Sequence, residues 1–227
     1  MTAFEAGRLG IGARVSPEGI PWRDYRWREL APALLGGLPL CLYWWALERT
    51  SRRTRPGFES LPDDAIIFMF HKNMHPLAID KILSDDRGGP LMLGYHGLLS
   101  YLFSLPWLFI HAVKGFRYHR GGDRRPLDQI ADFLSRHPRE RMAMFTDTAG
   151  PYGVVRSTLI PLSVKTGRPL VALTYRISRP ITLLNHSLPL PFSTLEARFS
   201  RVVTPDELRR LGRAESKRLL QELADRL

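Results

Sequence analysis

The stretch that decides the fold is residues 65–80, AIIFMFHKNMHPLAID. Its first six residues are apolar and rich in β-branched and aromatic side chains, which predicts a buried strand, and residues 77–83 predict a helix. Side chains at such a junction are fixed by the sheet while they remain reachable, so reactive groups are common there. We therefore look for chemistry first between residues 71 and 80.

The alternation of strand and helix continues along the rest of the chain. Amphipathic and apolar runs predict helices and strands in turn, at 127–137 (helix), 141–145 (strand), 157–167 (helix closed by Gly167), 169–177 (strand) and 195–203 (strand). This order predicts an α/β fold, a single domain with a mainly parallel central sheet flanked by helices.

The last helix has a well-marked start. Thr204 is the expected N-cap, Pro205 suits the first helical position and Glu207 completes a capping box. We expect a catalytic domain over 61–227, preceded by a lead-in and an N-terminal interfacial helix over 1–60.

Two long apolar segments indicate contact with a membrane. Residues 30–47 carry no charge but contain Gly-Gly and Pro39, which favours an interfacial or re-entrant helix, with a buried core helix as the alternative. Trp44 and Trp45 next to a cluster of arginines are typical of an interface anchor. Residues 91–113 are also uncharged, and their glycines and Pro106 favour a helical hairpin that dips into one leaflet or packs around an acyl-chain tunnel.

The charge of the chain points to an anionic partner. The formal net charge is +11, which attracts either nucleic acid or anionic lipid. Arginines at 49, 52, 53 and 55 follow the apolar segment directly, which favours lipid, and no nucleic-acid-binding motif is present. A single cysteine, Cys41, excludes an internal disulfide, and the first residues lack the apolar core of a signal peptide. We expect a membrane-associated protein on the cytoplasmic face that binds no nucleic acid.

A histidine and an aspartate stand five positions apart in HPLAID, at His75 and Asp80. A carboxylate this close along a turn and helix holds an imidazole in the tautomer that accepts a proton. Such a pair has no nucleophile of its own, so it suits a reaction in which the substrate's hydroxyl attacks. His71 is a second candidate for the base, and a metal site at His71, His75 and Asp80 is a lesser alternative.

The stretch resembles the His-x-x-x-x-Asp signature of the glycerophosphate and lysophospholipid acyltransferases. Three further blocks follow in the order of that superfamily. GFRYHRGG, 115–122, resembles its arginine-bearing segment, where Arg120 or Arg117 would bind the acceptor's phosphate. FTDTAGP, 145–151, resembles its acid-and-glycine motif, with Asp147 in the acidic place and Gly150 in the turn. GRPLVAL, 167–173, resembles a glycine- and proline-containing strand that comes later in the superfamily's sequences.

Within that superfamily, the motifs are most similar to those of a small bacterial branch in which an aromatic residue precedes the histidine, as Phe70 precedes His71. That alignment selects His71 as the base, whereas the spacing to Asp80 selects His75. The block at Asp147 departs from the branch because the motif's arginine is missing.

The resemblance implies transfer of an acyl group from acyl-CoA or acyl-carrier protein to the hydroxyl of a lysophospholipid or related lipid. It implies neither a metal nor a redox cofactor, and anionic membrane lipids and an acyl thioester donor as partners. The alternative from another class is a non-catalytic lipid-binding protein that keeps the fold.

Overall fold

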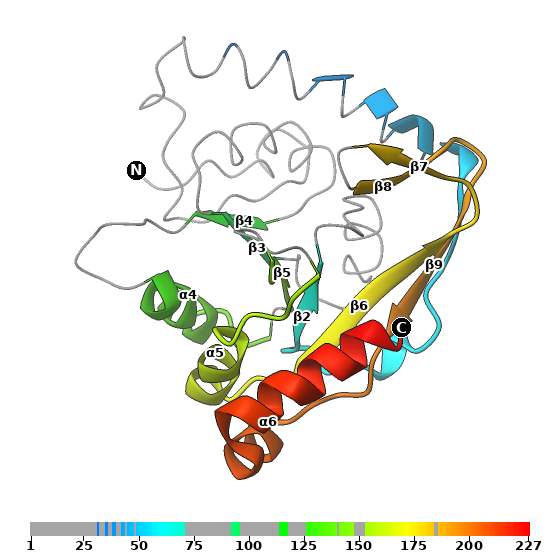
Figure 1. Ribbon diagram of the computed structural model, residues 1–227. Helices are drawn as coiled ribbons and strands as arrows, with labels where there is room; N and C mark the ends of the chain where they lie inside the picture. The colour runs from blue at the N-terminus through cyan, green and yellow to red at the C-terminus, as the bar shows by residue number, and fades with distance from the viewer. Residues whose placement is uncertain are drawn as a thin grey trace.

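The computed structural model describes residues 31, 35, 38–39, 42–43, 45–47, 49–70, 92–95, 114–117, 126–139, 141–147, 153–183 and 186–227. At 92–95, 114–117, 126, 183 and 186 it describes the backbone. Figure 1 shows a twisted sheet with three helices along one face and a small hairpin at one end.

A seven-stranded sheet forms the centre of the molecule, in the order β1-β9-β6-β2-β5-β3-β4. Each neighbouring pair is parallel except β6 and β9. The predicted α/β fold with a mainly parallel sheet is confirmed. The strands are β1 (Arg52–Thr54), β2 (Ile66–Met69), β3 (Met92–Tyr95), β4 (Lys114–Arg117), β5 (Met142–Phe145), β6 (Leu170–Ile177) and β9 (Thr194–Phe199).

Strand β2 lies in the middle of the sheet, between β6 and β5, and all four of its residues are buried. Ile66 and Phe68 belong to a core cluster with residues of the helices α4 (Pro126–Ser135), α5 (Leu159–Thr166) and α6 (Pro205–Asp225). Ile67 and Met69 alternate with them and are buried as well. A strand buried on both sides is what the continuous apolar run at 65–70 predicts.

The predicted helix ends are confirmed at two places. Gly167 ends α5 with φ of 71°, in the left-handed region that a glycine adopts without steric cost. Thr204 begins α6, where its Oγ1 accepts a hydrogen bond from the N–H of Glu207 at 3.2 Å.

The first residues of the apolar segment 91–113 do not form the helix that we predicted. Met92–Tyr95 is not helical but forms β3, paired in parallel with both β4 and β5. An uncharged run without periodicity fits a buried strand as well as a helix, and here the sheet selects the strand. The remaining residues of 91–113 lie outside those the structure describes.

An antiparallel hairpin, β7 (Pro180–Leu183) and β8 (His186–Pro189), follows the carboxyl end of β6.

The described residues between 31 and 47, together with 49 and 50, are helical, and the O–H of Tyr43 donates to the carbonyl of Pro189. Residues 52–54 then form the edge strand beside β9, and Phe58, in the short helix η3 (Phe58–Ser60), is fully buried. The division at residue 60 stays a prediction. Among the described residues, no helix is both long enough and apolar enough to cross a bilayer.

Candidate active site at the carboxyl edge of the sheet

Four neighbouring parallel strands, β2, β5, β3 and β4, end at the same edge of the sheet. From β2 the chain goes past β5 to β3, and from β5 it goes past β2 to β6, so the connections of these two neighbouring strands run in opposite directions across the sheet. In open α/β sheets, ligands bind outside the carboxyl ends of the strands, where the direction of the connections reverses. The fold therefore places the candidate site at this edge.

The register of β2 and β5 brings two of the sequence blocks to one place. Met69 and Phe145, the last residues of the two strands, are partners, and the N–H of Thr146 donates to the carbonyl of Met69 at 3.0 Å. His71 follows Met69 by two residues and Asp147 follows Phe145 by two residues. The predicted histidine block and the acid-and-glycine block thus leave the sheet side by side.

The arginine block reaches the same edge through β4. Its residues Gly115 to Arg117 lie in that strand, and Arg117 is the last residue, in register with Tyr95 of β3. Arg120 follows three residues later in the sequence. The sheet therefore brings to one edge the ends of three strands, β2, β5 and β4, that are separated by tens of residues along the chain.

Asp147 lies directly after β5 and is fully buried. Its Oδ2 accepts a hydrogen bond from the N–H of Gly153 at 2.9 Å. The carboxylate therefore ties together the two ends of the loop that leaves β5. This bond gives Asp147 a structural function in that loop, and its predicted role in substrate binding stays a prediction.

A side chain of α6 holds the same loop from the other side. Gln221 accepts from the N–H of Val155 at 2.8 Å and donates to the carbonyl of Gly153 at 2.9 Å. Gly153 has φ of 77°, where its lack of a Cβ removes the steric cost. Nothing in the sequence indicates Gln221, because 66 residues separate it from Val155.

Thr146 contributes a buried hydroxyl at this edge. Its side chain is 3% exposed, and among the described residues its Oγ1 has no hydrogen-bond partner. This hydroxyl directly precedes Asp147 at the edge where we place the candidate site.

Five of the predicted site residues lie outside those the structure describes: His71, His75, Asp80, Arg120 and Gly150. Their roles stay predictions. Within the described ranges, no three histidine, cysteine, aspartate or glutamate side chains are grouped to hold a metal ion.

A cavity of about 370 Å³ lies at the opposite, amino edge, where Asp64 precedes β2 and Arg168 precedes β6. The guanidinium of Arg168 is buried there and donates to the carbonyls of Leu134 and His137, at the end of α4. Arginine in this position satisfies carbonyls that a helix end leaves unpaired. The cavity is thus a feature of the packing between α4 and β6.

No protein-family profile matches the chain, and no characterised protein matches it in sequence. Among solved structures it is similar to the crystal structure of the 1-acyl-sn-glycerophosphate (LPA) acyltransferase PlsC from Thermotoga maritima. The two are 17% identical, the match covers 90% of this chain and 82% of that chain, and the TM-score is 0.48. Because the identity and the TM-score are low, the fold assignment rests on the strand order and pairing of the sheet.

Proposed function

We propose that the protein transfers an acyl group from a thioester to the hydroxyl of a lysophospholipid or related lipid. The observation that carries the proposal is that β2, β4 and β5, the strands from which the three sequence blocks continue, end at one edge of the sheet. The histidine block follows β2, the arginine block spans the end of β4 and the acid-and-glycine block follows β5. The blocks resemble acyltransferase motifs in sequence, and the strands before them end at the edge where open α/β sheets bind ligands, which supports the proposal.

In the proposed reaction, His75 or His71 accepts the proton of the acceptor hydroxyl, whose oxygen attacks the thioester carbonyl of acyl-CoA or acyl-carrier protein. Asp80 orients the imidazole and stabilises its protonated form. Arg120, or Arg117, binds the phosphate of the acceptor. The tetrahedral intermediate collapses with release of the thiolate, which takes up the proton from the histidine.

We also propose that the protein works at the cytoplasmic face of a membrane. The described part of the N-terminal helix exposes Leu35 (72%), Leu42 (67%) and Trp45 (53%). Large apolar side chains in this number on one helix are typical of an interfacial segment.

The test is acyl transfer by the purified full chain, with lysophosphatidic acid in mixed vesicles as acceptor and radiolabelled acyl-CoA or acyl-carrier protein as donor. We expect His71→Ala and His75→Ala to separate the two candidate bases, and the double variant to lose transfer. His137→Ala is the matched control, because His137 lies after α4 at the amino edge, where its ring contacts Phe133 in a tilted arrangement with 4.6 Å between the ring centroids. Undiminished transfer by the double variant would overturn the mechanism.

One observation favours the second candidate, a lipid-binding protein without catalysis. Asp147, in the acidic place of the motif, is buried and bonded to Gly153. A protein of this kind would retain lysophospholipid in a binding assay and yield no acylated product with either donor.

A further inference from the structure

The turn between β8 and β9 holds an aromatic side chain in an unusual state. Phe192 has φ of 65° and is 72% exposed. A bulky residue in the left-handed region is strained, and strain of this kind persists only where the surrounding structure imposes it. An exposed phenylalanine ring is also unfavourable in water, so the turn carries two costs at one residue.

Hydrogen bonds from three elements fix this turn. The side chain of Ser193 is buried and its hydroxyl donates to the carbonyl of Leu190, while the N–H of Phe192 donates to Oγ1 of Thr50 at 3.3 Å. The N–H of Arg52 donates to the carbonyl of Ser193 at 3.0 Å. The exposure of the ring is therefore built into the fold.

The N-terminal helical segment, which Thr50 links to this turn, also carries exposed apolar side chains. Leu35, Leu38, Leu42 and Trp45 follow one another at intervals of three or four residues, and all are more than half exposed. In an uninterrupted α-helix, a rotation of 100° per residue would place these four on one side, roughly 160° from the buried Leu47. The described part of this segment thus contains both exposed apolar side chains and one, Leu47, that is buried against the protein.

The hairpin and the residue after it carry two more exposed apolar side chains. Ile181 is 49% exposed in β7, Leu190 is 37% exposed after β8, and Tyr43 ties the helix to Pro189. Figure 1 shows the helix and the hairpin together, at the end of the molecule away from α6. We call the set of exposed apolar side chains at Leu35, Leu38, Leu42, Trp45, Ile181, Leu190 and Phe192 the docking face.

Exposed arginines border the docking face. The guanidinium of Arg49 lies 5.3 Å from the ring centre of Trp45. Arg52 and Arg179 flank the turn through their backbone bonds to Ser193 and Leu190. In the described part of the chain, none of the three forms an ion pair with a carboxylate. Apolar side chains bordered by arginine match an anionic lipid surface, whereas a second copy would bring the same positive charges together.

We infer that the docking face inserts into an anionic bilayer at two points, the N-terminal helix and the corner of the hairpin, with Phe192 as the wedge at the second. This inference rests on the membrane association proposed above. A surface with two contacts fixes the orientation of the protein as well as its attachment, which a single helix does not.

Flotation of the full chain with phosphatidylcholine vesicles, with and without phosphatidylglycerol, tests the inference. We expect Phe192→Ala to weaken binding to the anionic vesicles roughly tenfold and Phe192→Trp to preserve it. Phe192→Gly relieves the backbone strain and removes the ring, so it should bind as weakly as the alanine variant while folding at least as stably.

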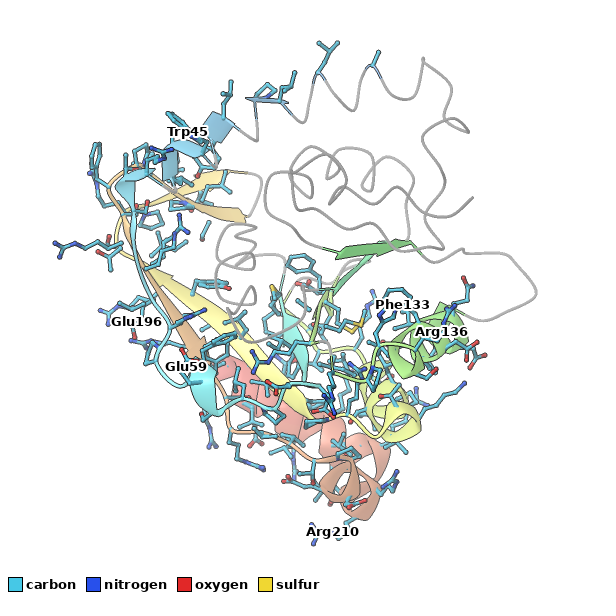
Figure 2. All side chains as sticks on the ribbon, turned by 180° about the vertical axis from the view of Figure 1, so that it is seen from behind. Trp45, Glu59, Phe133, Arg136, Glu196 and Arg210 are labelled. Carbon is cyan, nitrogen blue, oxygen red and sulfur yellow. The ribbon has the colours of Figure 1, made fainter. Side chains whose placement is uncertain are left out.

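The charge is tested by Arg49→Ala and Arg179→Ala, each expected to weaken binding to anionic vesicles about fivefold. Arg210→Ala is the matched control, because Figure 2 shows Arg210 at the end of the molecule opposite Trp45. Wild-type protein that fails to bind overturns the membrane association itself. Wild-type binding that Phe192→Ala and Phe192→Gly leave intact overturns only the inference. Self-association that Phe192→Ala abolishes while vesicle binding stays intact reassigns the face to a second copy and also overturns it.

Discussion

Gln221→Leu is expected to loosen the loop at the candidate site and to lower the free energy of unfolding. The side-chain amide forms three hydrogen bonds, two with the loop at Gly153 and Val155 and one with Asp225 within α6. Leucine keeps the approximate volume and removes all three. The chain then contains an N–H at Val155 and a carbonyl at Gly153 without their partner.

The magnitude follows from burial. Val155 is fully buried, so water does not replace the lost acceptor, and an unsatisfied buried group costs roughly 1 to 3 kcal/mol. Gly153 is half-buried and contributes less. We expect a total loss of about 2 to 4 kcal/mol, with Asp225 adding little because its bond is exposed.

Urea unfolding followed by circular dichroism measures the loss, and hydrogen exchange of the Val155 amide locates it. Gln221→Glu keeps an acceptor for Val155 but turns an oxygen toward the carbonyl of Gly153, so roughly half of the loss is expected. Glu222→Leu, the next residue and an exposed one, is the control, with a change below about 0.5 kcal/mol. A Gln221→Leu variant with wild-type stability and an equally protected Val155 amide would refute the clamp.

Three further predictions concern the same scaffold. Asp147→Ala should lower the free energy of unfolding by about 2 kcal/mol in urea titrations, since it removes the acceptor of the Gly153 N–H, and Asp147→Asn should lose less. Burial raises the pKa of Tyr43 from 10.0 to about 12, so its contribution to stability is complete below pH 10 and is lost as the pH rises through about 12; Tyr43→Phe should remove this loss from the alkaline unfolding curve. The hydrogen bond from Arg201 lowers the pKa of Glu207 below 4.5, so its contribution is present above pH 4.5 and is lost as the pH falls through the lowered value; Glu207→Gln should flatten this part of the acid unfolding curve.

The sequence predicted those elements whose signals are local. The buried strand at 66–69, the glycine that ends α5 and the threonine that begins α6 each depend on a few neighbouring residues, and all three are confirmed. Strands β1 and β4 are the two edge strands and have polar sequences, RRT and KGFR, whereas β3 lies in an uncharged run that fits a helix as well, so these three short strands were not predicted. Such short strands are stabilised by their partners across the sheet, which a local pattern does not contain.

At the candidate site too, local features were predicted from the sequence and contacts between distant residues were not. The spacing of His75 and Asp80 and the order of the motifs are visible in the sequence, and the parallel register explains why the blocks around Met69 and Phe145 meet. Gln221 was missed because its partners are distant along the chain. The hydrogen bond of Asp147 to the Gly153 N–H was also not predicted, because a sequence does not distinguish a buried structural carboxylate from one that binds substrate.

Acyl transfer at a membrane surface is the central claim, and one measurement tests it most directly. The purified full chain is mixed with anionic vesicles that contain lysophosphatidic acid and is supplied in turn with radiolabelled acyl-CoA and acyl-carrier protein. We predict labelled phosphatidic acid with at least one donor, and none above background when His71 and His75 are both alanine. Folded, vesicle-bound wild-type protein that forms no labelled product with either donor would contradict the account.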